Sequence, residues 1–148
     1  MIGVLLVSHG KMAEGIKDSV NMIVGQQDHF DTLALNPGQD INELKTNLFS
    51  SSKKLETGKG VLIFVDLYGA SPYNASMSCV QQWQEHDMNV RVITGMSLPM
   101  VINAVCSRDG SSLDELAKEC ILAGQENIQE AIESLLKASE STTDEDDY

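Results

Sequence analysis

The chain has 148 residues, the size of a single domain with one substantial core. Only 10 Lys and Arg stand against 22 Asp and Glu, so the formal net charge is −12. An acidic surface of this kind argues against a protein that binds nucleic acid, and equally against docking on anionic lipid. We therefore expect neither a nucleic-acid partner nor a membrane partner.

The apolar segments of the chain are short. None approaches the roughly 18–20 residues that a membrane helix requires. The apolar start lacks a basic leader and ends at Ser8, so it predicts a first strand, not a signal peptide. Three cysteines, Cys79, Cys106 and Cys120, form no Cys-x-x-Cys pair. They predict buried free thiols in a reducing cytoplasm, with no disulfide framework and no zinc site.

Apolar runs and helical patterns alternate along the chain. The runs predict four strands, at residues 2–7, 30–35, 61–65 and 90–93. The helical patterns follow them, at residues 12–24, 41–55, 71–85, 99–107 and 114–123. This order predicts an α/β fold: a doubly wound, mainly parallel sheet of four strands with helices on both faces.

Several residues mark expected helix ends. Gly25 follows the first helical pattern at the position where a glycine often ends a helix. Asp40 and Glu43 have the spacing of a capping box. Ser71 followed by Pro72 predicts an N-cap with a proline in the first turn.

The C-terminal part gives a weaker pattern. Ile128, Ile132 and Leu135 suggest a further helix. Residues 139–148 are polar and acidic, a composition that predicts disorder. We therefore expect one domain over residues 1–138 and an acidic tail over 139–148.

Ligands of an open parallel sheet bind beyond the carboxyl ends of its strands. Ser8 and His9 follow the first strand, and Asp66 follows the third strand, which commonly lies beside the first in doubly wound domains. A carboxylate bound to one ring nitrogen fixes the tautomer and leaves the other nitrogen as a nucleophile. The helix start at Ser71 offers N–H groups that suit a phosphoryl group. The arrangement predicts a nucleophilic histidine, an orienting carboxylate and an oxyanion pocket, or else a structural histidine beside an ordinary cap.

Other chemistries find less support. The chain has no Gly-x-x-x-x-Gly-Lys-Ser/Thr loop, no Gly-x-Gly-x-x-Gly turn and no Gly-x-Ser-x-Gly motif. A response-regulator receiver would share the aspartate after the third strand, but it needs an acidic pair where this chain has Ser8 and His9. His29 and His86 have no metal-ligand spacing with His9. We expect no metal and no cofactor.

Three segments carry a family resemblance: GVLLVSHGKMAEGI at 3–16, GVLIFVDLYGASPYNAS at 60–76 and TGMSLPMVINAV at 94–105. In order and spacing, the chain resembles the enzyme IIA component of the mannose-family sugar phosphotransferase system, over roughly residues 1–130. The resemblance implies a cytoplasmic phosphotransferase. Such a protein accepts a phosphoryl group from the carrier HPr on a histidine and passes it to a IIB component, upstream of the membrane components IIC and IID.

The resemblance also implies residue roles. The phosphorylated histidine falls on His9 and its orienting aspartate on Asp66. The phosphate pocket falls on a set of small or loop residues, namely Gly10, Leu67, Ala70 and Ser71. The chain departs from the family pattern at three positions, which hold Leu67, Ala70 and Ser97.

The family forms homodimers in which a C-terminal strand crosses to the partner's sheet. That strand would fall near residues 127–132, where the apolar spacing predicts a helix. Two other functions stay open: the phosphotransfer subunit of a dihydroxyacetone kinase, and a non-catalytic flavodoxin-like regulatory or binding module.

Overall fold

The computed structural model describes residues 1–146 and has one four-stranded sheet. Its strands are β1 (Gly3–His9), β2 (Phe30–Leu35), β3 (Val61–Val65) and β4 (Val90–Ile93). The spatial order is β2-β1-β3-β4, and all three neighbouring pairs are parallel. The predicted sheet is confirmed.

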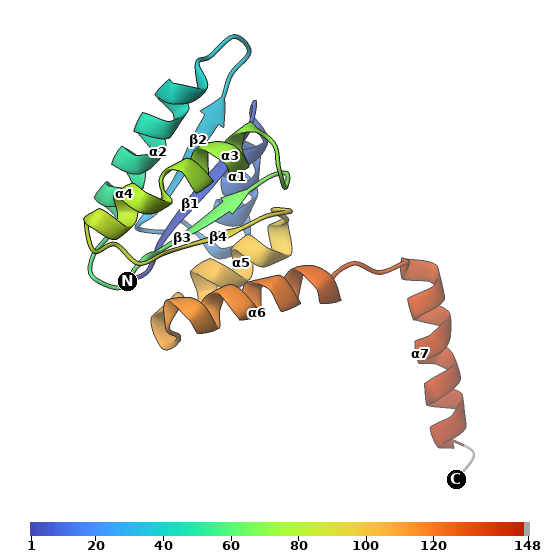
Figure 1. The fold of residues 1–148 in the computed structure, drawn as a ribbon. Helices are drawn as coiled ribbons and strands as arrows, with labels where there is room; N and C mark the ends of the chain where they lie inside the picture. The colour runs from blue at the N-terminus through green and yellow to red at the C-terminus, as the bar shows by residue number, and fades with distance from the viewer. Residues whose placement is uncertain (147–148) are drawn as a thin grey trace.

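Helices cover both faces of the sheet (Figure 1). On one face lie α2 (Ile41–Leu55), α3 (Ser71–Ser78) and α4 (Val80–Glu85). On the other lie α1 (Met12–Val24), α5 (Leu98–Ser107) and α6 (Leu113–Glu126), with a short 3-10 turn η1 (Arg108–Gly110) between the last two. The chain ends in α7 (Ala131–Asp146).

The two central strands explain the uninterrupted apolar runs. Leu5 and Ile63 point into the core under α2 to α4, whereas Leu6 and Phe64 point into the core under α1, α5 and α6. All four side chains are fully buried. A strand covered on both faces has no solvent side and therefore needs no polar alternation.

Some helix ends differ from the sequence predictions. The expected helix over 71–85 is two helices, with Cys79 between them. The N-cap of α3 is Ala70, not Ser71, which is the first helical residue. Asp40 caps α2 by accepting the N–H of Asn42. The reciprocal capping box lies instead at the start of α6, between Ser112 and Glu115.

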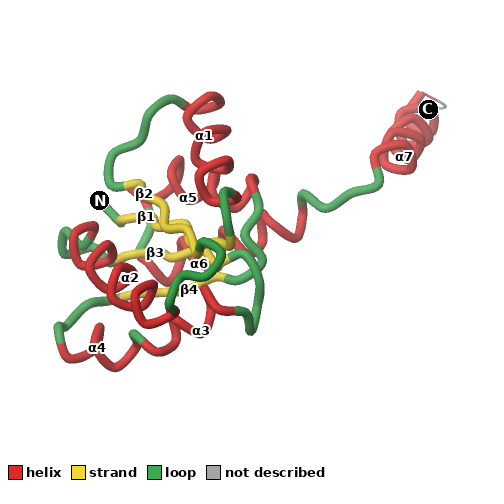
Figure 2. The backbone as a smooth tube through the Cα atoms, turned by 90° about the horizontal axis from the view of Figure 1, so that it is seen from above, coloured by secondary structure: helices red, strands yellow, loops and turns green. Residues whose placement is uncertain are grey.

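The C-terminal helix α7 stands away from the domain (Figures 1 and 2). Residues 127–130 connect it to α6 without forming helix or strand, and the predicted helix is confirmed from Ala131 onward. Within residues 1–146 no fifth strand forms, so strand exchange stays a prediction. Of the predicted acidic tail, residues 139–146 continue α7, and 147–148 lie outside the described residues. The domain boundary at 138 also stays a prediction.

The three cysteines are free, but they are not all buried. Cys79 and Cys120 lie in the core, whereas Cys106 is exposed. The expectation of three buried thiols is wrong at Cys106 because α5 buries Val101, Ala104 and Val105 and turns Cys106 outward. No helix in the described part of the chain is long and apolar enough to cross a membrane.

Candidate active site

The carboxyl ends of β1 and β3 bring His9 and Asp66 together, as the sequence predicted. The two strands pair in parallel with Val7 opposite Val65, so both residues lie just beyond the last paired positions. Nδ1 of His9 is 2.6 Å from Oδ2 of Asp66. This is the short distance typical of a charge-assisted hydrogen bond.

Backbone N–H groups hold the Asp66 carboxylate in place. The N–H of His9 donates to Oδ2 and that of Leu67 donates to Oδ1, each at 2.9 Å. Burial alone would raise the pKa of Asp66, but the hydrogen bonds from the backbone and ring of His9 and from the backbone of Leu67 oppose it, and the pKa is lowered. Asp66 is therefore the ionised, acceptor-only partner of the imidazole.

An ionised carboxylate at Nδ1 fixes the tautomer of His9. Nδ1 carries the proton and forms a hydrogen bond to Asp66 with it, which leaves a lone pair on Nε2. The side chain of His9 is 49% exposed, whereas that of Asp66 is 10% exposed. The geometry therefore presents one nucleophilic nitrogen to a molecule that arrives from solvent.

A tight turn fixes the backbone on the far side of His9. Gly10 has a φ of +53°, a left-handed conformation that glycine adopts without steric cost, and its N–H donates to the carbonyl of Leu35 at 2.9 Å. The buried hydroxyl of Ser8 accepts the N–H of Ala13 at 2.8 Å, which ties the start of α1 to the end of β1. His9 is thus held by both neighbours.

A shallow hollow of about 360 Å³ opens beside His9. Its lining consists of His9, Gly10, Leu35 and the turn 36–39 that follows β2. The turn at 36–39 is not among the site residues predicted from the sequence, although its position after a strand was the available signal. The hollow places free space directly against the imidazole.

The remaining predicted pocket residues lie in the loop after Asp66. Leu67 and the neighbouring Tyr68 are 60% and 73% exposed, so this part of the rim is apolar and open to solvent. Ala70 and Ser71 form the start of α3. Among the described residues, the hydrogen bond of the His9 side chain is to Asp66, and none joins it to Ser71. The loop thus places Ser71 at the rim without attaching it to the imidazole.

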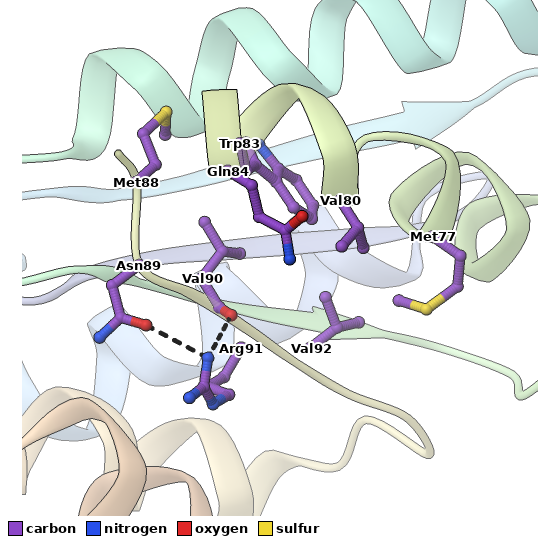
Figure 3. Close-up of a pocket in the computed structure, with 9 residues that line it drawn as sticks. All are labelled: Met77, Val80, Trp83, Gln84, Met88, Asn89, Val90, Arg91 and Val92. Carbon is purple, nitrogen blue, oxygen red and sulfur yellow. Dashed lines mark hydrogen bonds between the residues drawn. The ribbon is translucent and has the colours of Figure 1, made fainter. Parts of the chain in front are cut away.

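The other hollows lie elsewhere. One of about 390 Å³ follows the outer edge of β4 (Figure 3) and is lined by Met77, Val80, Trp83 and the strand itself. Neither His9 nor Asp66 contributes to it. His86 binds the carbonyl of Gln82 through Nδ1, within its own helix cap. Within residues 1–146, the hydrogen-bonded pair of His9 and Asp66 is the candidate site that the chemistry supports best.

Comparison with known protein families gives one match over most of the chain. Residues 3–121 match the family described as "PTS system fructose IIA component". The chain is 30% identical over 129 residues to the mannose-specific EIIAB component of Escherichia coli K12, covering 86% of this chain and 39% of that protein. It thus spans well under half the length of that relative. It is 28% identical over 144 residues to the fructose-specific EIIA component of Bacillus subtilis, covering 97% and 96% of the two chains.

Solved structures of similar fold carry related descriptions. An EIIA phosphotransferase-system component from Streptococcus agalactiae matches with a TM-score of 0.80 and 27% identity, covering 88% of this chain and 97% of that one. A mannose/sorbose-specific IIA subunit from Enterococcus faecalis matches with a TM-score of 0.76 and 27% identity, covering 87% and 93%.

Proposed function

Since the chain belongs to the mannose-family IIA components of the sugar phosphotransferase system, we propose that it carries a phosphoryl group on Nε2 of His9. One observation identifies His9 as the residue that carries the group. His9 binds Asp66 through Nδ1 at 2.6 Å, while its side chain stays half-exposed. Nε2 is therefore both nucleophilic and reachable.

The proposed reaction is a phosphoryl transfer between histidines. The lone pair on Nε2 of His9 attacks the phosphorus of a donor phosphohistidine, and the donor N–P bond breaks. The electron pair of that bond returns to the donor imidazole. Because the bond broken and the bond formed are both phosphoimidazole bonds, the transfer is nearly isoenergetic and needs mainly positioning and charge stabilisation.

Asp66 is proposed to orient the ring and to stabilise its charge. As the N–P bond forms, positive charge builds on the imidazole, whose Nδ1 proton remains in the hydrogen bond to the carboxylate. The phosphoryl group would then lie at the rim formed by Gly10 on one side and by the loop of Leu67, Ala70 and Ser71 on the other. The hydroxyl of Ser71 is a donor available to its oxygens.

The proposed donor is HPr and the proposed acceptor is a IIB component, with the membrane components IIC and IID downstream. The net charge of −12 suits a donor with basic residues around its own histidine, an effect on the rate of encounter. The transported sugar would not contact this site, because only phosphohistidine partners meet His9.

Labelling tests the proposal directly. Phosphoenolpyruvate, enzyme I and HPr are expected to produce acid-labile label on the parent protein. His9→Gln should fold and take up none, whereas His29→Gln and His86→Gln should label like the parent. Label that persists in His9→Gln, or a parent that stays unlabelled, would overturn the assignment.

We also propose that the protein forms a homodimer through residues 127–132. β4 is one of the two edge strands of the sheet, and the hollow of Figure 3 lies beside it. Ile128 and Ile132 are 83% and 68% exposed in the single chain, so the segment has apolar side chains to bury. Sedimentation at micromolar concentration should give about twice the monomer mass of 16.1 kDa, and a monomer would contradict the proposal.

A further inference from the structure

The loops that surround His9 contain a single basic residue. The carboxyl edge of the sheet is built from residues 10–11, 36–40, 66–70 and 94–97, which connect each strand to the next helix. Lys11 is the one Lys or Arg among them, and Asp40 and Asp66 are the acids. A phosphoryl group on His9 would carry up to two negative charges near neutral pH. Asp40 and Asp66 would repel these charges, and Lys11 is the one charged side chain of these loops that would attract them.

The ammonium of Lys11 is not engaged by another group in the described structure. It is the N-cap residue of α1, only two residues beyond His9, and its side chain is exposed. Among the described residues its ammonium forms no ion pair, although Glu14 follows it in the first turn of the helix. Its flexible four-carbon stem allows the charge to reach a group that appears beside it.

Lys17 differs from Lys11 in what its ammonium contacts. Lys17, on the same helix, lies with Nζ 5.6 Å from the centroid of the Phe30 ring. Phe30 begins β2, at the opposite end of the sheet from His9. Lys17 lies in the middle of α1 with its ammonium near Phe30, away from His9, so it offers a matched control for the charge of Lys11.

We propose that the ammonium of Lys11 binds the phosphoryl group carried on His9 and stabilises its dianionic form. This role rests on the proposed function, since it needs a phosphorylated His9. The bond to Lys11 forms only in the phosphorylated protein, because the imidazole ring itself is not an anion. Lys11 is thus a catalytic residue that contacts the transferred group, whereas Asp66 acts through the ring of His9.

Phosphorus NMR of chemically phosphorylated protein tests this contact without any partner protein. Potassium phosphoramidate phosphorylates histidine side chains directly, and the signal of His9 is assigned by its loss in His9→Gln. A unit charge about 5 Å from the phosphoryl group should lower the pKa of that group by about half a unit. The pKa should therefore rise by about that amount in Lys11→Gln and fall back in Lys11→Arg.

The controls separate the possible outcomes. Lys17→Gln should leave the phosphoryl pKa unchanged, and added salt should shrink the difference between Lys11→Gln and the parent. Equal pKa values in Lys11→Gln and the parent would overturn the role of Lys11 while leaving His9 as the carrier. A shifted pKa in a protein that HPr cannot label would instead keep the contact and overturn the proposed function.

Discussion

Asp66 accepts two hydrogen bonds from one residue, His9, on the same carboxylate oxygen. The ring Nδ1 lies 2.6 Å and the backbone N–H 2.9 Å from Oδ2. The backbone bond holds the carboxylate even when the ring turns away, so the acceptor is already in position for the imidazole. This preorganisation is the basis of the first two predictions.

Asp66→Asn should slow phosphoryl transfer from HPr at least about tenfold, roughly 1.4 kcal/mol of activation free energy. The amide is the size of the carboxylate but lacks the charge that stabilises the ring during transfer, and it can turn its NH₂ toward Nδ1. Rapid-quench transfer from phosphorylated HPr measures the rate, with circular dichroism as the folding control. An unchanged rate would make Asp66 a simple loop cap.

The lowered pKa of Asp66 predicts how stability depends on pH. Because its pKa in the folded protein lies below the ordinary value of 3.8, the ionised carboxylate stabilises the fold above that value. This contribution is lost as the pH falls through the lower folded value. In urea unfolding, the parent should be more stable than Asp66→Asn at pH 6, and the gap should narrow below pH 3.8. A gap that stays constant from pH 6 to acid conditions would contradict this linkage.

Ser52→Ala should destabilise the domain by about 1–3 kcal/mol. The buried hydroxyl of Ser52 accepts the indole N–H of Trp83 at 2.9 Å, so its removal leaves a buried donor without a partner. Urea unfolding followed by tryptophan fluorescence gives the free energy of unfolding. Thr46→Ala, on the exposed face of the same helix, is the control and should change it by less than about 0.5 kcal/mol.

Cys106 should react first with a thiol reagent such as DTNB. Burial raises the pKa of Cys79, and it raises that of Cys120 to about 11, so near pH 8 these two thiols are largely protonated and shielded. Cys106 is exposed. One fast equivalent is expected in the native protein and none in Cys106→Ser, with all thiols reacting in denaturant. Three equal fast reactions would show that the core opens readily.

Truncation after Ala138 should preserve both fold and labelling. Of the removed residues, 139–146 form the distal turns of α7, which stands away from the domain (Figure 2). Label uptake by the truncated protein, beside an unchanged circular dichroism spectrum of the domain, checks the expectation. A folded but unlabelled product would assign the acidic segment a part in partner binding.

The sequence predicted the sheet and the histidine–carboxylate pair because both follow from strand order. An apolar run such as 61–65 requires cover on both faces, and parallel strands place their carboxyl ends at one edge. The ends of the helices were harder to predict from the sequence. Asp40 and Glu43 have the spacing of a capping box, as do Ser112 and Glu115, but only the second pair forms one.

The parts of the site that the sequence missed depend on tertiary geometry. The turn after β2 borders His9 because β2 pairs with β1 in a register that places Leu35 opposite His9. Neither the register of the strands nor the size of the hollow can be predicted from the residues of the turn alone. The outward position of Cys106 likewise depends on which face of α5 packs against the sheet.

The half-exposure of His9 also limits the order of events in the proposed cycle. With Nδ1 occupied by Asp66 and the side chain half-exposed, Nε2 is the one ring nitrogen left for a partner. A donor and an acceptor must therefore occupy the same surface in turn, and their binding is mutually exclusive. An excess of unphosphorylated acceptor should then act as a competitive inhibitor of loading, so that the ratio of the two partners sets the flow of phosphoryl groups through the carrier.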